Sequence, residues 1–252
     1  RGALALSDGN DDCKEEPEAS LDNPRGFFES RQLLELNESL LSSIGAHWHT
    51  PPLFPITWPI QGRLEVFHNQ RLRFESYALN NNWVDKDPRL CITHPAYLHI
   101  FLKRVPLACV LREPMEVAIS LYARNAIPIE RGLGLWFIYN FHLAASIRPG
   151  DVLTLYSSLL IDDLEIQSQS IIKELNGLLD RQGIKVPEMS QWRTIFRQHV
   201  EPGLNRSGLS RPPSNPQTLV DPALLDSCEK LYNQVKDAKS DFRNQFIDTF
   251  SA

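Results

Sequence analysis

The sequence predicts an α/β protein in which a parallel sheet is flanked by helices. Short, continuously apolar segments at residues 107–111 and 151–156 have the pattern of buried parallel strands, and amphipathic segments of helical period lie between and after them. The chain has 252 residues, of which 42% are hydrophobic and 23% charged, so wholesale disorder is excluded. We expect one domain spanning residues 1–252.

The first part of the chain changes character several times. Acidic side chains dominate the N-terminal segment, which predicts a solvated loop over residues 1–22. Leucines at helical spacing predict a helix that begins near Glu29 and ends at Gly45. Four prolines exclude a helix or a central strand at residues 50–59, and residues 61–79 have the pattern of a second amphipathic helix.

The remaining chain alternates between strands and helices. The expected strands cover residues 89–93, 107–111 and 151–156, and the expected helices cover residues 96–104, 115–125, 134–147 and 164–182. A proline-rich irregular segment follows at residues 187–222, and a C-terminal helix is expected at residues 223–250. Ligands of parallel sheets bind beyond the carboxyl ends of the strands, so polar residues at those ends are the first candidates for a site.

Charge and hydropathy exclude two broad classes of partner. Lys and Arg number 26 against 31 Asp and Glu, and this net charge of −5 argues against a general nucleic-acid binder. No apolar run reaches the roughly 18–20 residues that cross a bilayer, and the first residues lack a signal-peptide pattern. We therefore expect no membrane contact, and either a cytoplasmic location or the loss of a targeting segment.

The cysteines predict neither a disulfide framework nor a metal site. Cys13, Cys91, Cys109 and Cys228 lie far apart, with no CxxC pair and no paired histidine spacing. We expect four reduced cysteines and no bound metal.

The segment LREPMEVAISLYARN carries the most chemical information. Arg112 ends the strand at residues 107–111, Pro114 is suited to the first turn of a helix, and Ser120 follows Arg112 by eight positions. A guanidinium fork and a hydroxyl both suit phosphate oxygens. The alternative is that Arg112 pairs with Glu113 or Glu116 and that Ser120 is merely small.

This segment resembles the 3′-phosphate-binding segment of sulfotransferases that use 3′-phosphoadenosine 5′-phosphosulfate (PAPS). In that family an Arg and a Ser eight positions apart hold the 3′-phosphate of the nucleotide. Further family-like strings follow one another from Asn23 to Arg206, namely NPRGFFE with LNESLLSSIGAHW, DKDPRLCIT, GLWFIYN, VLTLYSSLL and HVEPGLNR. The resemblance implies a fold of the P-loop NTPase type. It also implies transfer of a sulfuryl group from PAPS to a hydroxyl or amine of a carbohydrate or small metabolite, with PAP as product and no metal.

The chain departs from the family at its N-terminus. Family members begin with a strand and an R-S-G-T-S loop that binds the 5′-phosphosulfate through backbone N–H groups. Nothing before Asn23 supplies that loop, and residues 2–6 have the pattern of the tail of the helix that follows it. We expect either an N-terminally truncated fragment or a relative that has lost the loop, and favour truncation. The first strand of the sheet would then be missing.

Two other functions compete with this one. A non-catalytic interaction module with a defunct nucleotide site would explain the missing loop. A P-loop kinase would need GxxxxGKS or GxxxxGKT, and the chain has neither.

The resemblance implies catalytic roles for three residues. Glu29, next to two phenylalanines, is the first candidate for the base that takes the acceptor proton, and its alternative role is that of a carboxylate in a first helical turn. His94, at the carboxyl end of the expected strand 89–93, is the second candidate. Lys86 is expected to neutralise the transferring sulfuryl group or to contact the acceptor, and its alternative role is an ion pair with Asp85 or Asp87.

Four further residues receive binding or structural roles. We expect Arg89 and Trp48 to bind the acceptor substrate. Arg206 closes over the 3′-phosphate, or lies in a solvated loop. Trp136 belongs to a periodic apolar helix and is expected in the core.

Overall fold

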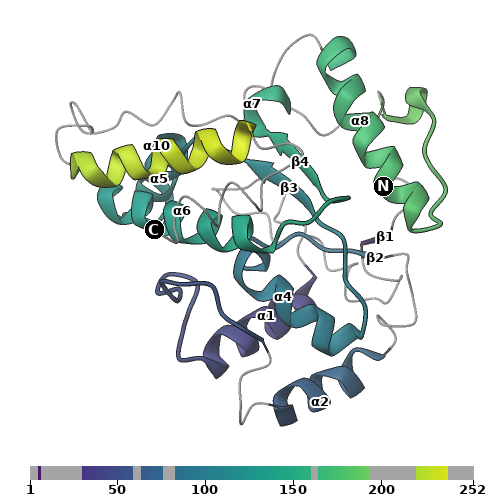
Figure 1. Ribbon diagram of the computed structural model, residues 1–252, viewed down its shortest axis with the longest axis horizontal. Coiled ribbons are helices and arrows are strands. Elements are labelled where there is room, and N and C mark those ends of the chain that lie inside the picture. Colours follow the sequence, from purple (N-terminus) through teal and green to yellow (C-terminus); the bar gives the residue numbers. More distant parts are fainter. Residues whose placement is uncertain are drawn as a thin grey trace. The chain divides into compact units, whose positions relative to one another are not determined.

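The computed structural model describes residues 5–6, 30–58, 64–75, 83–159, 164–192, 194 and 220–237. These residues form a mixed α/β structure of mostly helices with two pairs of parallel strands (Figure 1). The chain divides into two compact units. Unit 1 comprises Arg1–Val105 and Gln182–Lys185, and unit 2 comprises Pro106–Arg181 and Val186–Ala252.

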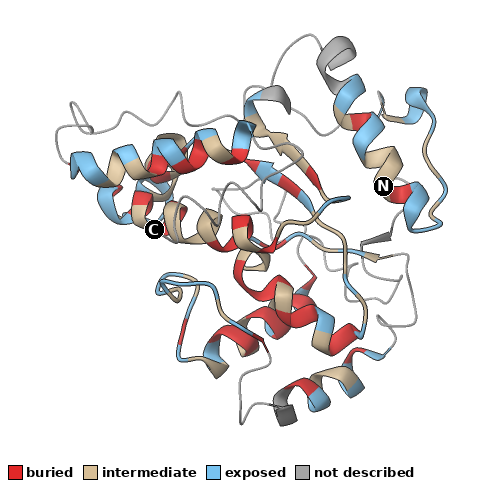
Figure 2. Cartoon of the chain, viewed as in Figure 1, coloured by how far each residue is buried: buried red, intermediate tan, exposed pale blue. Residues whose placement is uncertain are grey.

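Helix α1 (Arg31–Ser43) begins and ends where its sequence predicts. The Ser30 hydroxyl caps the helix by accepting a hydrogen bond from the Leu33 N–H at 3.5 Å. Gly45 follows the helix with φ of +72°, a conformation that glycine adopts without strain. Leu33, Leu36, Leu40 and Leu41 lie on one buried face, as the periodicity predicts (Figure 2).

Helix α4 (Leu90–Phe101) replaces the expected strand at residues 89–93, so that prediction is wrong. Buried positions recur every three or four residues, at Ile92, Ala96 and Ile100, which is a helical period. Five apolar residues are too few to separate this period from that of a buried strand. The helix packs on α1 and on α2 (Leu64–Arg73), and it ends at Phe101, before the expected residue 104.

The first strand pair also differs from expectation. Strand β1 (Ala5–Leu6) pairs in parallel with β2 (Trp83–Val84), so residues 5 and 6 are extended and do not form the tail of a helix. The other residues of the predicted acidic loop at 1–22 lie outside the described part of the chain.

The second strand pair forms the sheet of unit 2, as predicted. Strand β3 (Ala108–Leu111) pairs in parallel with β4 (Val152–Leu155) in an unbroken register from Ala108 with Val152 to Leu111 with Leu155. Asp151 joins the amino ends of the two strands, because its carboxylate accepts hydrogen bonds from the N–H groups of Leu107 at 3.0 Å and Arg148 at 2.9 Å.

Three helices pack together beside this sheet. Helix α5 (Pro114–Asn125) follows β3, α6 (Ile129–Ser146) follows α5, and α10 (Pro222–Asp237) packs on both. The core of unit 2 joins Leu111 of β3, Leu133 and Trp136 of α6, and Leu231 of α10. Pro114 occupies the first turn of α5, where its missing N–H costs no hydrogen bond.

The helices predicted after β3 are confirmed. Helix α6 begins five residues earlier than the expected residue 134, and α8 (Leu164–Arg181) follows the short α7 (Tyr156–Leu159). The C-terminal helix is described as far as Asp237. Most of the proline-rich segment lies outside the described residues. Where the structure describes the chain, no helix combines the length and the apolar character that crossing a membrane requires.

Replacing Gly132 by alanine should destabilise the chain. A Cβ at Gly132 would lie 3.0 Å from the Cα of Ala118 on α5, which is closer than side chains normally approach. We expect a loss of about 1–2 kcal/mol in the free energy of unfolding, since overpacking outweighs the gain in helix propensity. Gly134→Ala, which meets no atom within 4 Å, should instead add about 0.5–1 kcal/mol. Equal effects of the two substitutions in urea denaturation would contradict this packing.

The Cys228 thiol should resist alkylation in the native chain. Burial raises its pKa from 9.0 to about 12, helped by the neighbouring Glu229 carboxylate, and its Sγ lies 3.6 Å from the Leu133 carbonyl oxygen. Because the thiolate is the reactive form, iodoacetamide at pH 9 should label Cys228 only in denaturant. The raised pKa also stabilises the fold below pH 9, and this contribution is lost as the pH rises toward 12. Peptide mapping by mass spectrometry measures the labelling, and equal rates in native and denatured chain would contradict it.

Candidate functional site

Arg112 and Tyr156 leave the sheet of unit 2 at the same edge. Leu111 and Leu155 are the last residues of the β3–β4 register, and Arg112 and Tyr156 directly follow them. Since the strands are parallel, both residues lie at the carboxyl edge, where open α/β sheets bind ligands. The guanidinium carbon of Arg112 lies 4.6 Å from the centre of the Tyr156 ring, which is a cation–π contact.

Glu116 is the charged partner of Arg112. The Nε of Arg112 donates a hydrogen bond to the Glu116 carboxylate at 3.0 Å, so of the two glutamates considered as partners the structure selects Glu116. Within the described part of the chain, the Nη1 and Nη2 groups of Arg112 have no acceptor. The Arg112 side chain is 23% exposed, so solvent can reach those N–H donors.

Ser120 lies on the same side of α5 as this ion pair. Glu116 and Ser120 lie four positions apart and form one row along α5, and the ion pair with Glu116 joins Arg112, which precedes the helix, to this row. Ala118, on the other side of α5, packs against Gly132 of α6. Ser120 is partly exposed, and its hydroxyl makes no hydrogen bond to any residue that the structure describes. The row therefore offers a guanidinium fork and a hydroxyl, with a carboxylate between them.

The electrostatics of this row are mixed. Burial raises the pKa of Tyr232 on α10, and the carboxylates of Glu113 and Glu116 raise it further. One guanidinium thus stands against two carboxylates, with the partial positive charge at the start of α5, roughly half an elementary charge, beside them. An anion would be held here by directed hydrogen bonds more than by a broad positive field.

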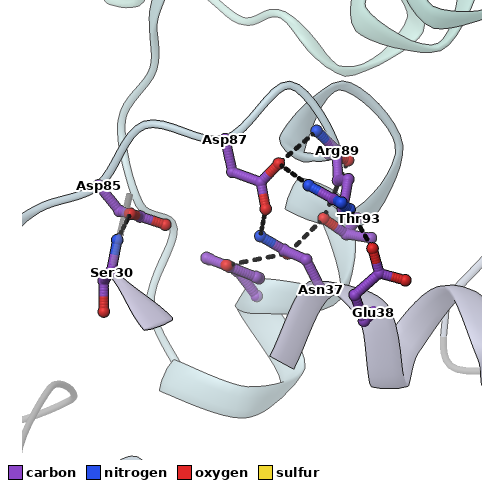
Figure 3. A network of polar contacts seen from close by, with 8 residues as sticks. Ser30, Asn37, Glu38, Asp85, Asp87, Arg89 and Thr93 are labelled. Atoms are coloured by element: carbon purple, nitrogen blue, oxygen red, sulfur yellow. Dashed lines mark hydrogen bonds and ion pairs between the residues drawn. The ribbon is translucent and has the colours of Figure 1, made fainter. Parts of the chain in front are cut away.

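Unit 1 contains a buried polar network centred on Asp87 (Figure 3). One oxygen of Asp87 accepts from the Asn37 amide at 2.8 Å, and the other accepts from the N–H of Arg89 at 2.9 Å and from its Nη1 at 3.0 Å. The amide oxygen of Asn37 in turn accepts from the hydroxyls of Thr93 at 2.6 Å and Tyr97 at 3.0 Å. The network joins α1 to the first turns of α4.

Arg89 is held between two carboxylates. Its Nη1 contacts Asp87, and its Nε donates to Glu38 at 2.6 Å. Burial alone would lower the pKa of Arg89, but Asp87 and Glu38 outweigh it and raise the pKa. Arg89 therefore has a structural role that does not depend on binding a sulfuryl acceptor. The side chain of Lys86, beside Asp87 in the sequence, is exposed.

His94 does not lie at the end of a strand, and that placement is corrected. It belongs to α4, is 4% exposed, and its Nε2 lies 2.6 Å from the carbonyl oxygen of Val105. A carbonyl oxygen only accepts, so Nε2 carries the proton and donates it to Val105. The residue was misplaced because residues 89–93 were expected to be extended.

The other predicted site residues are distributed as follows. Trp48 lies in a turn closed by the His47–Thr50 bridge, with its ring 5.3 Å from that of His49. Glu29 and Arg206 lie outside the described residues. Unit 1 thus contains Trp48, Lys86, Arg89 and His94, and unit 2 contains Arg112 and Ser120. Within unit 2, Arg112 and Ser120 are linked through Glu116, which pairs with Arg112 and precedes Ser120 by one turn of α5.

Sequence inspection missed two contributors to this site. Tyr156 was expected as the last residue of a strand, yet counting both strands to their ends would have set it beside Arg112. Trp136 was expected in the core, where it lies with 4% exposure. Its indole Nε1 also donates to the backbone oxygen of Arg112 at 2.9 Å. No sequence pattern pairs two residues that are 24 positions apart in this way.

Among the residues that the structure describes, no three His, Cys, Asp or Glu side chains gather in a way that could hold a metal ion. Comparisons of the chain with models of protein families, with curated proteins and with solved structures found no match.

Asp87→Asn should destabilise unit 1 strongly. The Asp87 side chain is 1% exposed and accepts three hydrogen bonds, so an amide nitrogen there would face donors and leave Arg89 poorly compensated. We expect a loss of about 3 kcal/mol in the free energy of unfolding. Glu38→Gln is the control, because Glu38 is 39% exposed and its pair should contribute less than about 1 kcal/mol. A smaller loss for Asp87→Asn than for Glu38→Gln in urea denaturation would rule out the central role of Asp87.

Proposed function

We propose that this chain is a PAPS-dependent sulfotransferase and that the row along α5 binds the 3′-phosphate of the nucleotide. The observation that carries the proposal is the placement of Arg112 at the carboxyl end of β3, paired with Glu116, with Ser120 one turn beyond Glu116 on α5. Both side chains keep hydrogen-bond donors that no described residue uses. The resemblance of the segment to the family's phosphate-binding segment supports the same assignment.

Each group in the row has a definite task in this proposal. The Nη1 and Nη2 groups of Arg112 form a fork that matches two oxygens of a phosphate, and the Ser120 hydroxyl donates to a third. Glu116 takes only the Nε–H, so it orients the guanidinium without using the fork. The cost is a carboxylate close to the bound anion, so we expect moderate affinity.

Sulfuryl transfer breaks the bond between sulfur and the bridging phosphate oxygen and forms one between sulfur and the acceptor oxygen or nitrogen. The acceptor proton passes to a base, and PAP leaves with the electron pair of the broken bond. His94 suits this base poorly, since it is buried and its Nε2 donates to Val105. The proposal therefore keeps Glu29 as base and the exposed Lys86 as the cation that neutralises the transferring group. Arg206 is proposed to close over the 3′-phosphate.

The acceptor side of the proposal rests on Trp48 and Arg89. The turn at Trp48, whose side chain is half-buried between exposed neighbours, offers an aromatic surface to a carbohydrate or small metabolite. Arg89 contributes by ordering the segment that carries Lys86, because both of its partners are protein carboxylates.

Arg112→Ala should abolish discrimination between nucleotides with and without a 3′-phosphate. The unsubstituted chain should bind PAP more tightly than adenosine 5′-monophosphate (AMP), because only PAP reaches the guanidinium. One charge-assisted contact contributes about 1.5–3 kcal/mol, so the affinity for PAP should fall roughly 10- to 150-fold while that for AMP is unchanged. Isothermal titration calorimetry on the full chain measures both.

Arg181→Ala is the matched control. Arg181 belongs to the same unit, is exposed at the end of α8, and its Nη2 donates to the Gly150 carbonyl oxygen at 2.7 Å. The control should leave both affinities unchanged. Equal affinities of the unsubstituted chain for PAP and AMP would refute the phosphate assignment, and PAP binding without sulfuryl transfer from PAPS would favour a non-catalytic module.

A further inference from the structure

We propose that Trp136 is a positioning residue for the phosphate site, a role that rests on the proposed function and goes beyond packing. Its indole N–H donates to the backbone oxygen of Arg112 at 2.9 Å. That oxygen belongs to the peptide at which β3 turns into α5. The hydrogen bond thereby fixes the backbone from which the Arg112 side chain departs.

The Arg112 oxygen needs such a partner because neither neighbouring element supplies one. The β3–β4 ladder ends at Leu111 and Leu155, so Arg112 lies beyond it. The helical hydrogen bonds of α5 begin with the oxygen of Glu113, which accepts from the Val117 N–H at 3.2 Å. The carbonyl oxygen of Arg112 therefore takes part in neither the strand ladder nor the helix. A backbone oxygen that is buried without a hydrogen-bond partner costs free energy of folding. The indole N–H, a donor only, fills this gap.

The indole itself is held rigidly. Trp136 is 4% exposed and lies in the core of unit 2, with its ring 6.4 Å from that of Tyr232 on α10. Helix α6, which carries Trp136, is in close contact with α5 where Gly132 meets Ala118. The Trp136 indole N–H is therefore fixed in position relative to the start of α5.

The Arg112 side chain converts this order into a binding geometry. Its guanidinium is held by the Tyr156 ring and by Glu116 at Nε, and its Nη groups make no hydrogen bond to any described residue. A long side chain magnifies any rotation of the peptide at its base. Displacements of about 1 Å at a binding group reduce function up to 100-fold, so loss of the Trp136 hydrogen bond should be felt at the phosphate.

The test is Trp136→Phe in the full chain, with PAP and AMP as the two probes in calorimetry. We expect the affinity for PAP to fall roughly tenfold, the size of one hydrogen bond, while that for AMP stays the same. Trp192→Phe is the matched control: it removes an equivalent indole hydrogen bond, to Asn176 at 2.9 Å, away from Arg112. It should change neither affinity. In the Arg112→Ala background, Trp136→Phe should have no further effect on PAP.

A purely structural role predicts a different pattern. Trp136→Phe would then reduce the affinities for PAP and AMP equally, or would still reduce the affinity for PAP in the Arg112→Ala background. Either result would overturn the inference. If Trp136→Phe does not fold, 3-benzothienylalanine at position 136 keeps the ring shape, lacks the N–H, and should give the same PAP-specific loss. If the chain with phenylalanine or 3-benzothienylalanine at position 136 still discriminates between PAP and AMP as before, the positioning role of Trp136 is overturned, while the proposed function is not. Equal affinity of the unsubstituted chain for PAP and AMP overturns the proposed function with it.

Discussion

The parallel pairing of β3 with β4 is the constraint on which the candidate site depends. Two antiparallel strands would put the end of one beside the start of the other, whereas the observed register puts both carboxyl ends together. Arg112 and Tyr156 meet for that reason, although 44 residues separate Leu111 from its partner Leu155. Asp151 ties the opposite ends of both strands, so the register is fixed at its start and its consequence appears at its end.

The pairing of Arg112 with Glu116 has two opposing effects on the site. It restricts a long side chain to one conformation, which reduces the conformational entropy that a ligand would otherwise have to remove. It also places a negative charge beside any anion bound at the Arg112 fork. The balance depends on geometry: Glu116 uses Nε at 3.0 Å and leaves both Nη groups, so the ordering is retained without competition for the same donors.

Sequence periodicity was sufficient for long elements and insufficient for short ones. The leucines of α1, the strands β3 and β4, and the spacing from Arg112 to Ser120 were all predictable, because each follows from a repeat or a count within one segment. Residues 89–93 were not, since five apolar residues fit a strand and a helical turn equally well. His94 was misplaced as a consequence. The place of Tyr156 beside Arg112 follows from the strand register and could have been counted. The role of Trp136 depends on a tertiary contact that no local pattern encodes.

The two groups of predicted site residues differ in how the fold uses their hydrogen-bonding capacity. Arg89 belongs to a family-like string, yet its side chain pairs with Asp87 and with Glu38 of α1, so packing alone accounts for its presence. Arg112 and Ser120 differ, since within the described residues the fold engages one guanidinium nitrogen and leaves the other two and the Ser120 hydroxyl without partners. A ligand with several acceptor oxygens would use these donors. For that reason we place the proposed phosphate site in unit 2.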